Sequence, residues 1–142
     1  MRRRIMISRS EEESLGLGEE LGRSARRGTV YALHGDLGSG KTVLARGIAR
    51  GLGISDDITS PTFTLLEIYE GVMPLYHFDL YRIEKAAEFD GLGFEEYWEG
   101  DGVSVIEWAE RAGGLLPDST IVISLEYHGE RERKISIEYP GD

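Results

Sequence analysis

The residues with the clearest chemistry lie at positions 35–42, where the segment GDLGSGKT fits the phosphate-binding pattern G-x-x-x-x-G-K-[ST]. Its glycines lack a Cβ, so the backbone can curl with its N–H groups turned inward and form a nest for anions. Lys41 can reach the β- and γ-phosphates of a nucleotide as a point charge. The Thr42 hydroxyl can bind a Mg²⁺ that bridges the same phosphates. The segment therefore predicts nucleotide binding through a P-loop.

The flanks of this segment have the pattern that a P-loop requires, which is a strand before the loop and a helix after it. The apolar run Val30–Leu33 is typical of a buried strand, and residues 43–49 are typical of a helix. The alternative is a chance glycine-rich turn that precedes a helix. The complete motif between two correct flanks disfavours that alternative.

Two acids are candidates to complete the site, because a P-loop needs a carboxylate at the end of a neighbouring apolar strand. Asp79 follows the mainly apolar segment 75–78, and Glu107 follows the mainly apolar segment 103–106. Ligands of open α/β sheets collect at the carboxyl ends of the strands, so an acid at either place is well positioned. The alternative for each is a solvated acid at a strand end. Because both acids occur in a chain that also has a P-loop, we expect at least one of them to serve the nucleotide site.

The polar segment 56–64 follows the predicted P-loop helix and is rich in hydroxyl groups. In P-loop proteins a loop at this place can sense the γ-phosphate, ordered by contacts with phosphate and Mg²⁺. The alternative is an ordinary connection, for which clusters of Ser, Thr and Pro are common.

The rest of the chain alternates between predicted strands and helices, which indicates an α/β fold in one domain over residues 1–142. Ser10 and Glu13 mark the start of a helix that we expect to end near Arg27 and Gly28. Two antiparallel hairpins are expected, one from strands at 64–69 and 75–81 and the other from strands at 121–127 and 134–139. Further elements are expected at 5–8 (strand), 103–106 (strand), 84–90 (helix) and 109–112 (helix).

Composition and charge exclude or disfavour several classes of function. The chain has no Cys, which excludes disulfides and thiolate metal sites. No apolar run approaches the about 20 residues of a membrane helix, and the basic start leads into no signal peptide, so a cytoplasmic location is expected. The net charge of −10 disfavours an independent grip on a nucleic-acid backbone. Any role on nucleic acid would then need a partner that does the binding.

Four motifs together resemble the TsaE (YjeE) family, the small bacterial ATPases of tRNA threonylcarbamoyladenosine synthesis. They are GDLGSGKT at 35–42, TSPTF at 59–63, HFDLYR at 77–82 and IEWAE at 106–110. The resemblance covers almost the whole chain, with the motifs in the right order. Ser39 stands where relatives often carry Ala, and this difference should be harmless.

The resemblance implies a single-domain, three-layer P-loop NTPase fold whose mixed sheet is mainly parallel, with antiparallel hairpins. It implies that Thr42 and Glu107 hold Mg²⁺, and that Asp79 is the Walker-B-like acid near the metal or the attacking water. It makes Lys41, Asp79 and Glu107 the catalytic residues. The residues implied to bind ATP are Leu37, Gly38, Ser39, Gly40, Lys41 and Thr42. The switch residues implied are Thr59, Ser60 and Thr62.

The resemblance also implies partners, the proteins TsaD and TsaB, which transfer the threonylcarbamoyl group to an adenosine of tRNA. The ATPase itself is expected to contact tRNA only indirectly, and its hydrolysis to drive or reset that complex. This division of labour agrees with the acidic charge. No arginine stands in a position that marks an arginine finger, so slow hydrolysis alone and faster hydrolysis with partners are expected.

Two other functions stay open at this point. A small-molecule kinase usually carries an Arg-bearing lid, and the short acidic region between the two candidate acids disfavours an anionic acceptor. A nucleotide-binding switch without required hydrolysis is the other alternative. The sequence has no motif like N-K-x-D that would recognise guanine, which favours ATP over GTP. The candidates for contacts with the adenine base are residues near 8–10 and near Arg131.

Overall fold

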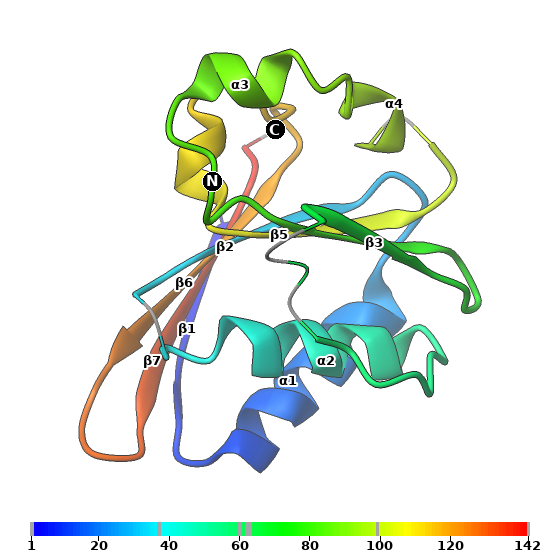
Figure 1. Ribbon diagram of the computed structural model, residues 1–142. Coiled ribbons are helices and arrows are strands. Elements are labelled where there is room, and N and C mark those ends of the chain that lie inside the picture. Colours follow the sequence, from blue (N-terminus) through cyan, green and yellow to red (C-terminus); the bar gives the residue numbers. More distant parts are fainter. Residues whose placement is uncertain (1, 37, 60, 62–63, 99, 142) are drawn as a thin grey trace.

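The computed structural model describes residues 2–36, 38–59, 61, 64–98 and 100–141. Its centre is one seven-stranded sheet in the order β1-β7-β6-β2-β5-β4-β3 (Figure 1). The strands are β1 (Arg2–Ser8), β2 (Val30–His34), β3 (Leu66–Tyr69), β4 (Leu75–Asp79), β5 (Val103–Glu107), β6 (Ile121–Tyr127) and β7 (Arg133–Tyr139). The helices are α1 (Glu11–Ser24), α2 (Lys41–Gly51), α3 (Ala86–Asp90), α4 (Glu95–Trp98) and the 3₁₀-helix η1 (Ala109–Ala112).

The sheet is mixed, with a parallel centre. Strands β6, β2, β5 and β4 pair in parallel, whereas β3 runs antiparallel to β4, β7 to β6, and β1 to β7. Both predicted hairpins are therefore confirmed, as β3–β4 and β6–β7. Only β3 and β7 run against the common strand direction, so the predicted mainly parallel sheet is confirmed as well.

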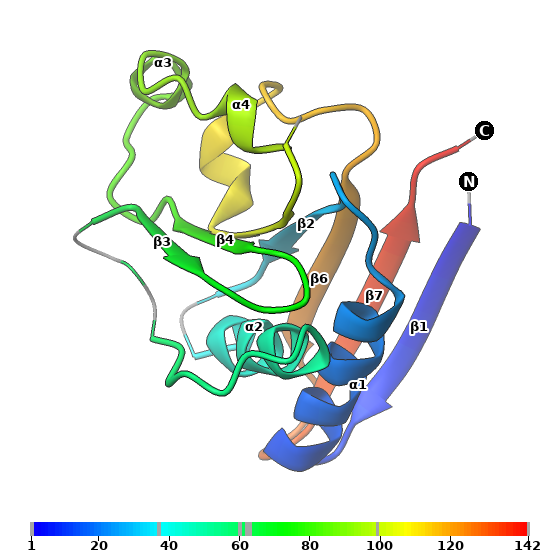
Figure 2. The same ribbon diagram turned by 90° about the vertical axis from the view of Figure 1, so that its right-hand side faces the viewer.

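Helices cover both faces of the sheet, and this confirms the expected three layers (Figure 2). One face carries α1 and α2 over an apolar cluster that includes Leu33, Leu44 and Val105. The other carries α3, α4 and η1 over a cluster that includes Phe78 and Ile106. In the described residues no helix combines the length and apolar character that a membrane crossing needs.

Helices α1 and α2 pack at very short range because glycines face each other. Gly18 and Gly22 of α1 lie against Gly47 and Gly51 of α2. A Cβ added at Gly47 would lie 2.4 Å from the Leu15 carbonyl oxygen, and one at Gly22 would lie 2.2 Å from the Ile48 carbonyl oxygen. Real Cβ atoms do not approach a backbone so closely, so this contact depends on glycine.

The start of α1 is as predicted, and its end is not. The Ser10 hydroxyl accepts a hydrogen bond from the Glu13 N–H (3.1 Å), which confirms the predicted cap. The helix ends at Ser24 rather than near Arg27, so that part of the prediction is wrong. Ala25 is extended (φ −69°, ψ 149°), and the Leu21 carbonyl accepts from the Ser24 hydroxyl (3.2 Å) and the Tyr31 hydroxyl (2.9 Å). In a helix that continued, the Leu21 carbonyl would accept a hydrogen bond from a backbone N–H. Here two side-chain hydroxyls donate to it instead.

Other predicted boundaries shift through sheet pairing. Strand β1 begins at Arg2 instead of Ile5, because it pairs with β7 along its whole length, from Arg2 opposite Tyr139 to Ser8 opposite Arg133. Strand β4 ends at Asp79, two residues earlier than predicted, because Asp79 is the last residue of the register with β5. Asp79 therefore stands at the carboxyl end of its strand.

Burial of the Tyr31 phenol predicts a loss of stability in alkali. Tyr31 is 2% exposed, and burial raises its pKa from 10.0 to about 12. The unfolded chain therefore loses this proton first, and the stabilisation present below pH 10 falls as the pH rises from 10 to about 12. A two-unit shift corresponds to about 2–3 kcal/mol.

Urea unfolding between pH 9 and 12 measures this effect, with Tyr31→Phe as the comparison. The variant keeps the ring, and the Ser24 hydroxyl still donates to the Leu21 carbonyl. We expect its stability to fall less steeply above pH 10 than that of the wild type. Parallel curves for the two proteins would contradict the prediction.

Candidate functional site

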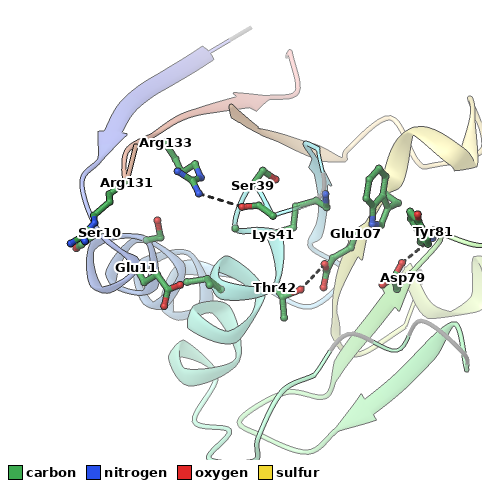
Figure 3. A pocket seen from close by; sticks show the side chains of 15 residues that line it. Ser10, Glu11, Ser39, Lys41, Thr42, Asp79, Tyr81, Glu107, Arg131 and Arg133 are labelled. Carbon is green, nitrogen blue, oxygen red and sulfur yellow. Dashed lines mark hydrogen bonds between the residues drawn. The ribbon is translucent and has the colours of Figure 1, made fainter. Parts of the chain in front are cut away.

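A cavity of about 590 Å³ opens where the P-loop, the carboxyl ends of β4 and β5, the start of α1 and the β6–β7 hairpin meet (Figure 3). Its described lining includes Ser10, Glu11, Gly38, Ser39, Gly40, Lys41, Thr42, Asp79, Tyr81, Glu107, Trp108, Arg131 and Arg133. The predicted site residues from the P-loop and both predicted acids thus share one cavity. Leu37 lies outside the described residues.

The P-loop has the backbone that its glycines predict. Gly38 (φ 80°) and Gly40 (φ 103°) lie in the left-handed region that side chains disfavour. Gly40 is the residue just before α2. Among the described residues, no side chain caps the start of α2, and its first turn carries no acid. Helix α1, in contrast, is capped by Ser10 and carries three acids in its first turn. The positive end of α2 is therefore open toward the cavity, whereas that of α1 is already neutralised.

Lys41 is buried at 5% exposure and bound to its own loop. Its Nζ donates to the carbonyl oxygens of Gly35 and Asp36 (3.1 Å to the latter) and lies 3.8 Å from the centre of the Trp108 ring. Burial lowers the pKa of Lys41, and nearby carboxylates, Glu107 foremost, oppose that shift. The Lys41 ammonium thus lies between acidic side chains, such as Glu107, and the aromatic ring of Trp108.

Glu107 joins the P-loop to the sheet. The Thr42 hydroxyl donates to Glu107 Oε1 (2.9 Å), and His77 Nε2 lies 2.6 Å from Glu107 Oε2. Glu107 is 2% exposed and His77 is fully buried. The hydrogen bond to Glu107 gives His77 Nε2 a partner within the sheet.

Asp79 and Glu107 lie side by side because they are register partners at the carboxyl ends of the parallel strands β4 and β5. Asp79 is 2% exposed, and its Oδ1 accepts from the Tyr81 N–H (2.9 Å). Both candidate acids therefore lie beside the P-loop, at the carboxyl ends of adjacent strands.

The donors near Thr42 suit a magnesium ion. In the described part of the chain, no group of three or more His, Asp and Glu side chains forms a metal site of its own. The Thr42 hydroxyl and the Glu107 carboxylate, 2.9 Å apart, are hard oxygen donors. Mg²⁺ is commonly held by one or two such groups, and phosphate oxygens and water complete its shell.

The predicted switch segment is described only in part. Ser60 and Thr62 lie outside the described residues, and Thr59 is exposed and absent from the described lining of the cavity. Leu65, the residue just after the segment, links Pro61 to β4 through backbone hydrogen bonds. The Leu65 N–H donates to the Pro61 carbonyl (2.8 Å), and the Leu65 carbonyl accepts from the Asp79 N–H (3.0 Å). Leu65 itself is left-handed (φ 68°), a conformation that costs a non-glycine residue free energy.

An aromatic wall that sequence patterns did not place stands beside Lys41. Trp108 is also left-handed (φ 58°), and its ring lies 4.9 Å from the ring of Tyr81. The Arg111 guanidinium lies 5.6 Å from the Tyr81 ring and 5.8 Å from the Trp108 ring. Trp98 belongs to the core, and Trp108 lines the cavity.

The β6–β7 hairpin supplies a residue that no motif marked. Arg133 points into the cavity (Figure 3). Its Nη2 donates to the Gly38 carbonyl (3.3 Å), and its guanidinium lies 4.4 Å from the centre of the Tyr127 ring. Sequence reasoning had named only Arg131 in this region. Arg133 lies 95 positions from Gly38 in the chain, so no local pattern could have paired them.

Comparison with known proteins identifies the family. The family described as threonylcarbamoyl adenosine biosynthesis protein TsaE matches residues 8–135. Its member from Treponema pallidum, tRNA threonylcarbamoyladenosine biosynthesis protein TsaE, is 44% identical over 131 residues, which are 92% of this chain and 97% of the relative. The Bacillus subtilis protein of the same name is 41% identical over 132 residues, 92% of this chain and 82% of the relative.

The fold agrees with that assignment. The crystal structure of Bacillus subtilis YdiB is similar with a TM-score of 0.87 and 35% identity, covering 99% of this chain and 87% of that chain. The expected P-loop NTPase fold in one mixed α/β domain is thereby confirmed. This chain belongs to the TsaE family of tRNA threonylcarbamoyladenosine biosynthesis proteins.

Proposed function

We propose that the chain binds Mg²⁺ and ATP in this cavity and hydrolyses the ATP to drive or reset a TsaD/TsaB complex that makes threonylcarbamoyladenosine in tRNA. One observation carries the proposal. The P-loop threonine and a strand-end carboxylate, Thr42 and Glu107, meet at 2.9 Å beside Lys41 at the open positive end of α2. This is the set of groups that phosphoryl-transfer sites of the P-loop class use.

Phosphate binding follows from the P-loop and α2. The uncapped start of the helix attracts anions, and the left-handed glycines let the backbone approach them closely. Lys41 is anchored on the carbonyls of Gly35 and Asp36 and would exchange part of that anchoring for phosphate oxygens. The exchange keeps a buried cation paired at every stage, which limits its cost.

The metal would be held by Thr42 and Glu107. When bound, Mg²⁺ neutralises charge on the β- and γ-phosphates. Glu107 keeps one oxygen toward Thr42 and the other toward His77. Asp79, beside Glu107 in the register, offers a carboxylate that can accept a proton of the attacking water and orient it. In-line attack by that water would then be assisted by charge stabilisation from Lys41 and the helix end.

The position of Trp108 predicts an optical signal for nucleotide binding. Its ring lies 3.8 Å from Lys41 Nζ, so movement of Lys41 toward a phosphate changes the environment of the indole. Adding ADP with Mg²⁺ should change the tryptophan emission of the wild type and of Trp98→Phe. The same addition should leave Trp108→Phe unchanged, because Trp98 is in the core. A response to ADP that persists in Trp108→Phe and is lost in Trp98→Phe would refute the prediction.

Dependence on partners follows from charge. A chain of net charge −10 has little attraction for tRNA phosphates, so the tRNA would be bound by the other proteins of the complex. The names of the relatives place the relatives themselves in tRNA threonylcarbamoyladenosine biosynthesis, and this supports a role of the present chain in the same pathway.

Steady-state release of phosphate from ATP with Mg²⁺ tests the proposal. It is measured with this chain alone and then with TsaB, TsaD and tRNA added. We expect slow release alone and strong stimulation by the complex. Tight ATP binding without stimulation would favour a nucleotide switch in place of a partner-driven ATPase.

A further inference from the structure

His77 is fully buried on β4 and does not belong to the described lining of the cavity, yet it contacts the residue that joins the sheet to the P-loop. Its Nε2 lies 2.6 Å from Glu107 Oε2. A carboxylate only accepts hydrogen bonds, so the ring Nε2–H is the donor. The proposed function gives this histidine no contact with nucleotide or metal.

We propose that His77 is a positioning residue that fixes the orientation of the Glu107 carboxylate, so that Oε1 faces Thr42 and is available to a divalent cation. The inference rests on the proposed function and deepens it. It assigns to the metal site a second layer of protein groups, which holds the carboxylate in place.

Strand register accounts for the contact. In the parallel pair β4–β5, His77 lies opposite Val105, and Asp79 lies opposite Glu107. Side chains alternate along each strand, so residues two apart share a face, and His77 lies diagonally beside Glu107. The register therefore keeps the two side chains on the same face of the sheet and next to each other.

The carboxylate needs such support, because the terminal torsion of a glutamate is broad and sets no single plane. In this site each oxygen has its own donor. Oε1 accepts from the Thr42 hydroxyl (2.9 Å), and Oε2 is bound by His77 (2.6 Å). Two donors at opposite oxygens define the carboxylate plane. A cation that takes the Thr42 side still leaves the His77 side held.

Packing alone does not account for a histidine at this position. The neighbouring residues on the same face, Leu75 and Val105, are apolar and fully buried. His77 Nδ1 has no hydrogen-bond partner within the described residues, and an unpaired buried polar atom costs stability. A purely structural position would be served better by an aliphatic side chain. The ring's contribution is the donor that it directs at Glu107.

The test compares His77→Gln with His77→Met in the full chain. Both are unbranched and of similar size, and both remove the ring, but only glutamine keeps an N–H donor near the position of Nε2. Mn²⁺ affinity is measured in the presence of ADP by electron paramagnetic resonance, and ADP affinity is measured separately in EDTA. Thermal unfolding of both variants shows that they are folded.

We expect His77→Met to weaken Mn²⁺ binding by about 10–100-fold, the usual effect of losing a group that orients a metal ligand. His77→Gln should stay within about threefold of the wild type, and ADP affinity in EDTA should be unchanged in both. In a Glu107→Ala background, His77→Met should have no further effect on Mn²⁺ affinity, because the carboxylate that it orients is gone.

Equal Mn²⁺ affinity of the Gln and Met variants would overturn the inference, as would a full effect of His77→Met in the Glu107→Ala background. Those outcomes leave the proposed function intact, provided that Glu107→Ala itself weakens Mn²⁺ binding. If the wild type binds no nucleotide, or if Glu107→Ala leaves Mn²⁺ affinity unchanged, the proposed function fails and the inference falls with it.

Discussion

Replacing Glu107 with alanine should lower the rate of ATP hydrolysis by about a hundredfold or more while ATP still binds. The carboxylate is bonded to Thr42 of the P-loop and, through His77, to the sheet. Its loss would remove the charge that is proposed to hold and orient Mg²⁺. Lys41 and the open end of α2 remain to hold the phosphates.

Phosphate release and ATP affinity are measured on the same preparation, with two comparisons. Glu110→Ala removes a neighbouring acid that is exposed and absent from the described cavity lining, so it should retain activity. Lys41→Ala should weaken ATP binding itself, because it removes the buried cation of the loop.

The same variant separates hydrolysis from switching. If Glu107→Ala binds ATP but hydrolyses it slowly, multi-turnover tRNA modification with TsaB and TsaD should fall in proportion. Full modification by this variant would show that binding alone suffices. Undiminished hydrolysis would instead remove Glu107 from the mechanism.

Replacing Gly47 with alanine should destabilise the fold by about 3 kcal/mol. The new Cβ would lie 2.4 Å from the Leu15 carbonyl oxygen and 2.9 Å from the Gly18 Cα. Both are backbone atoms of α1, so relief requires the two helices to separate. Because α2 carries Lys41 and Thr42, and α1 begins at the cavity, separation would also disturb the site.

Gly16→Ala is the matched control, since it makes the same change on α1 where no atom lies within 4 Å of the added Cβ. Alanine is favoured over glycine inside a helix, so this variant should gain about 0.5–1 kcal/mol. Urea unfolding midpoints of both variants decide the matter. Similar midpoints would mean that the close helix contact is not needed for stability.

The local features of the site followed from the sequence. Residues close together in the chain predict a P-loop, its flanking strand and helix, and a capped α1, and the structure has all of them. The two acids were found by a rule almost as local, because each ends an apolar strand. Parallel pairing of β4 with β5, which the sequence did not predict, then places Asp79 opposite Glu107.

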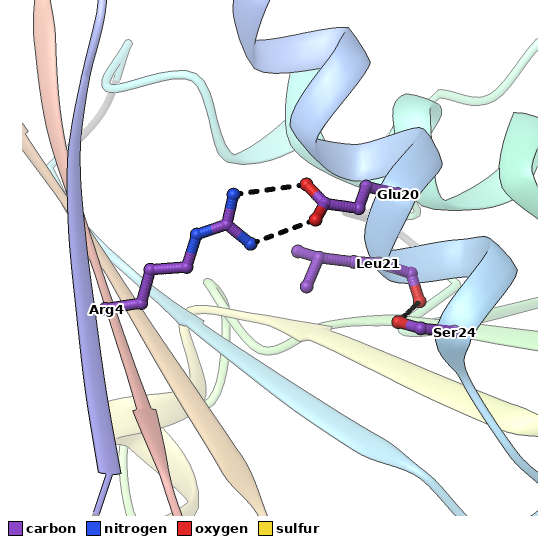
Figure 4. Close-up of polar contacts among 4 residues, drawn as sticks. All are labelled: Arg4, Glu20, Leu21 and Ser24. Carbon is purple, nitrogen blue, oxygen red and sulfur yellow. Dashed lines mark hydrogen bonds and ion pairs between the residues drawn. The ribbon is translucent and has the colours of Figure 1, made fainter.

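Element ends and the faces of α1 needed the tertiary structure. The close approach of α1 to α2 depends on glycines from both helices. In the sequence alone, these glycines indicate only a reduced helix propensity. Helix α1 is also tied to the edge strand, where Arg4 donates through both terminal nitrogens to Glu20, each at 3.2 Å (Figure 4). The same view shows the Ser24 hydroxyl on the Leu21 carbonyl at the last turn.

The sequence by itself thus determined the family, the chemistry of the P-loop and the acids that accompany it. Only the tertiary structure decided which groups hold those acids and surround Lys41. The partners are distant in the chain, 30 positions for His77 with Glu107 and 65 for Thr42 with Glu107. Residue patterns report on neighbours within a few positions, whereas these contacts arise from strand register and helix packing.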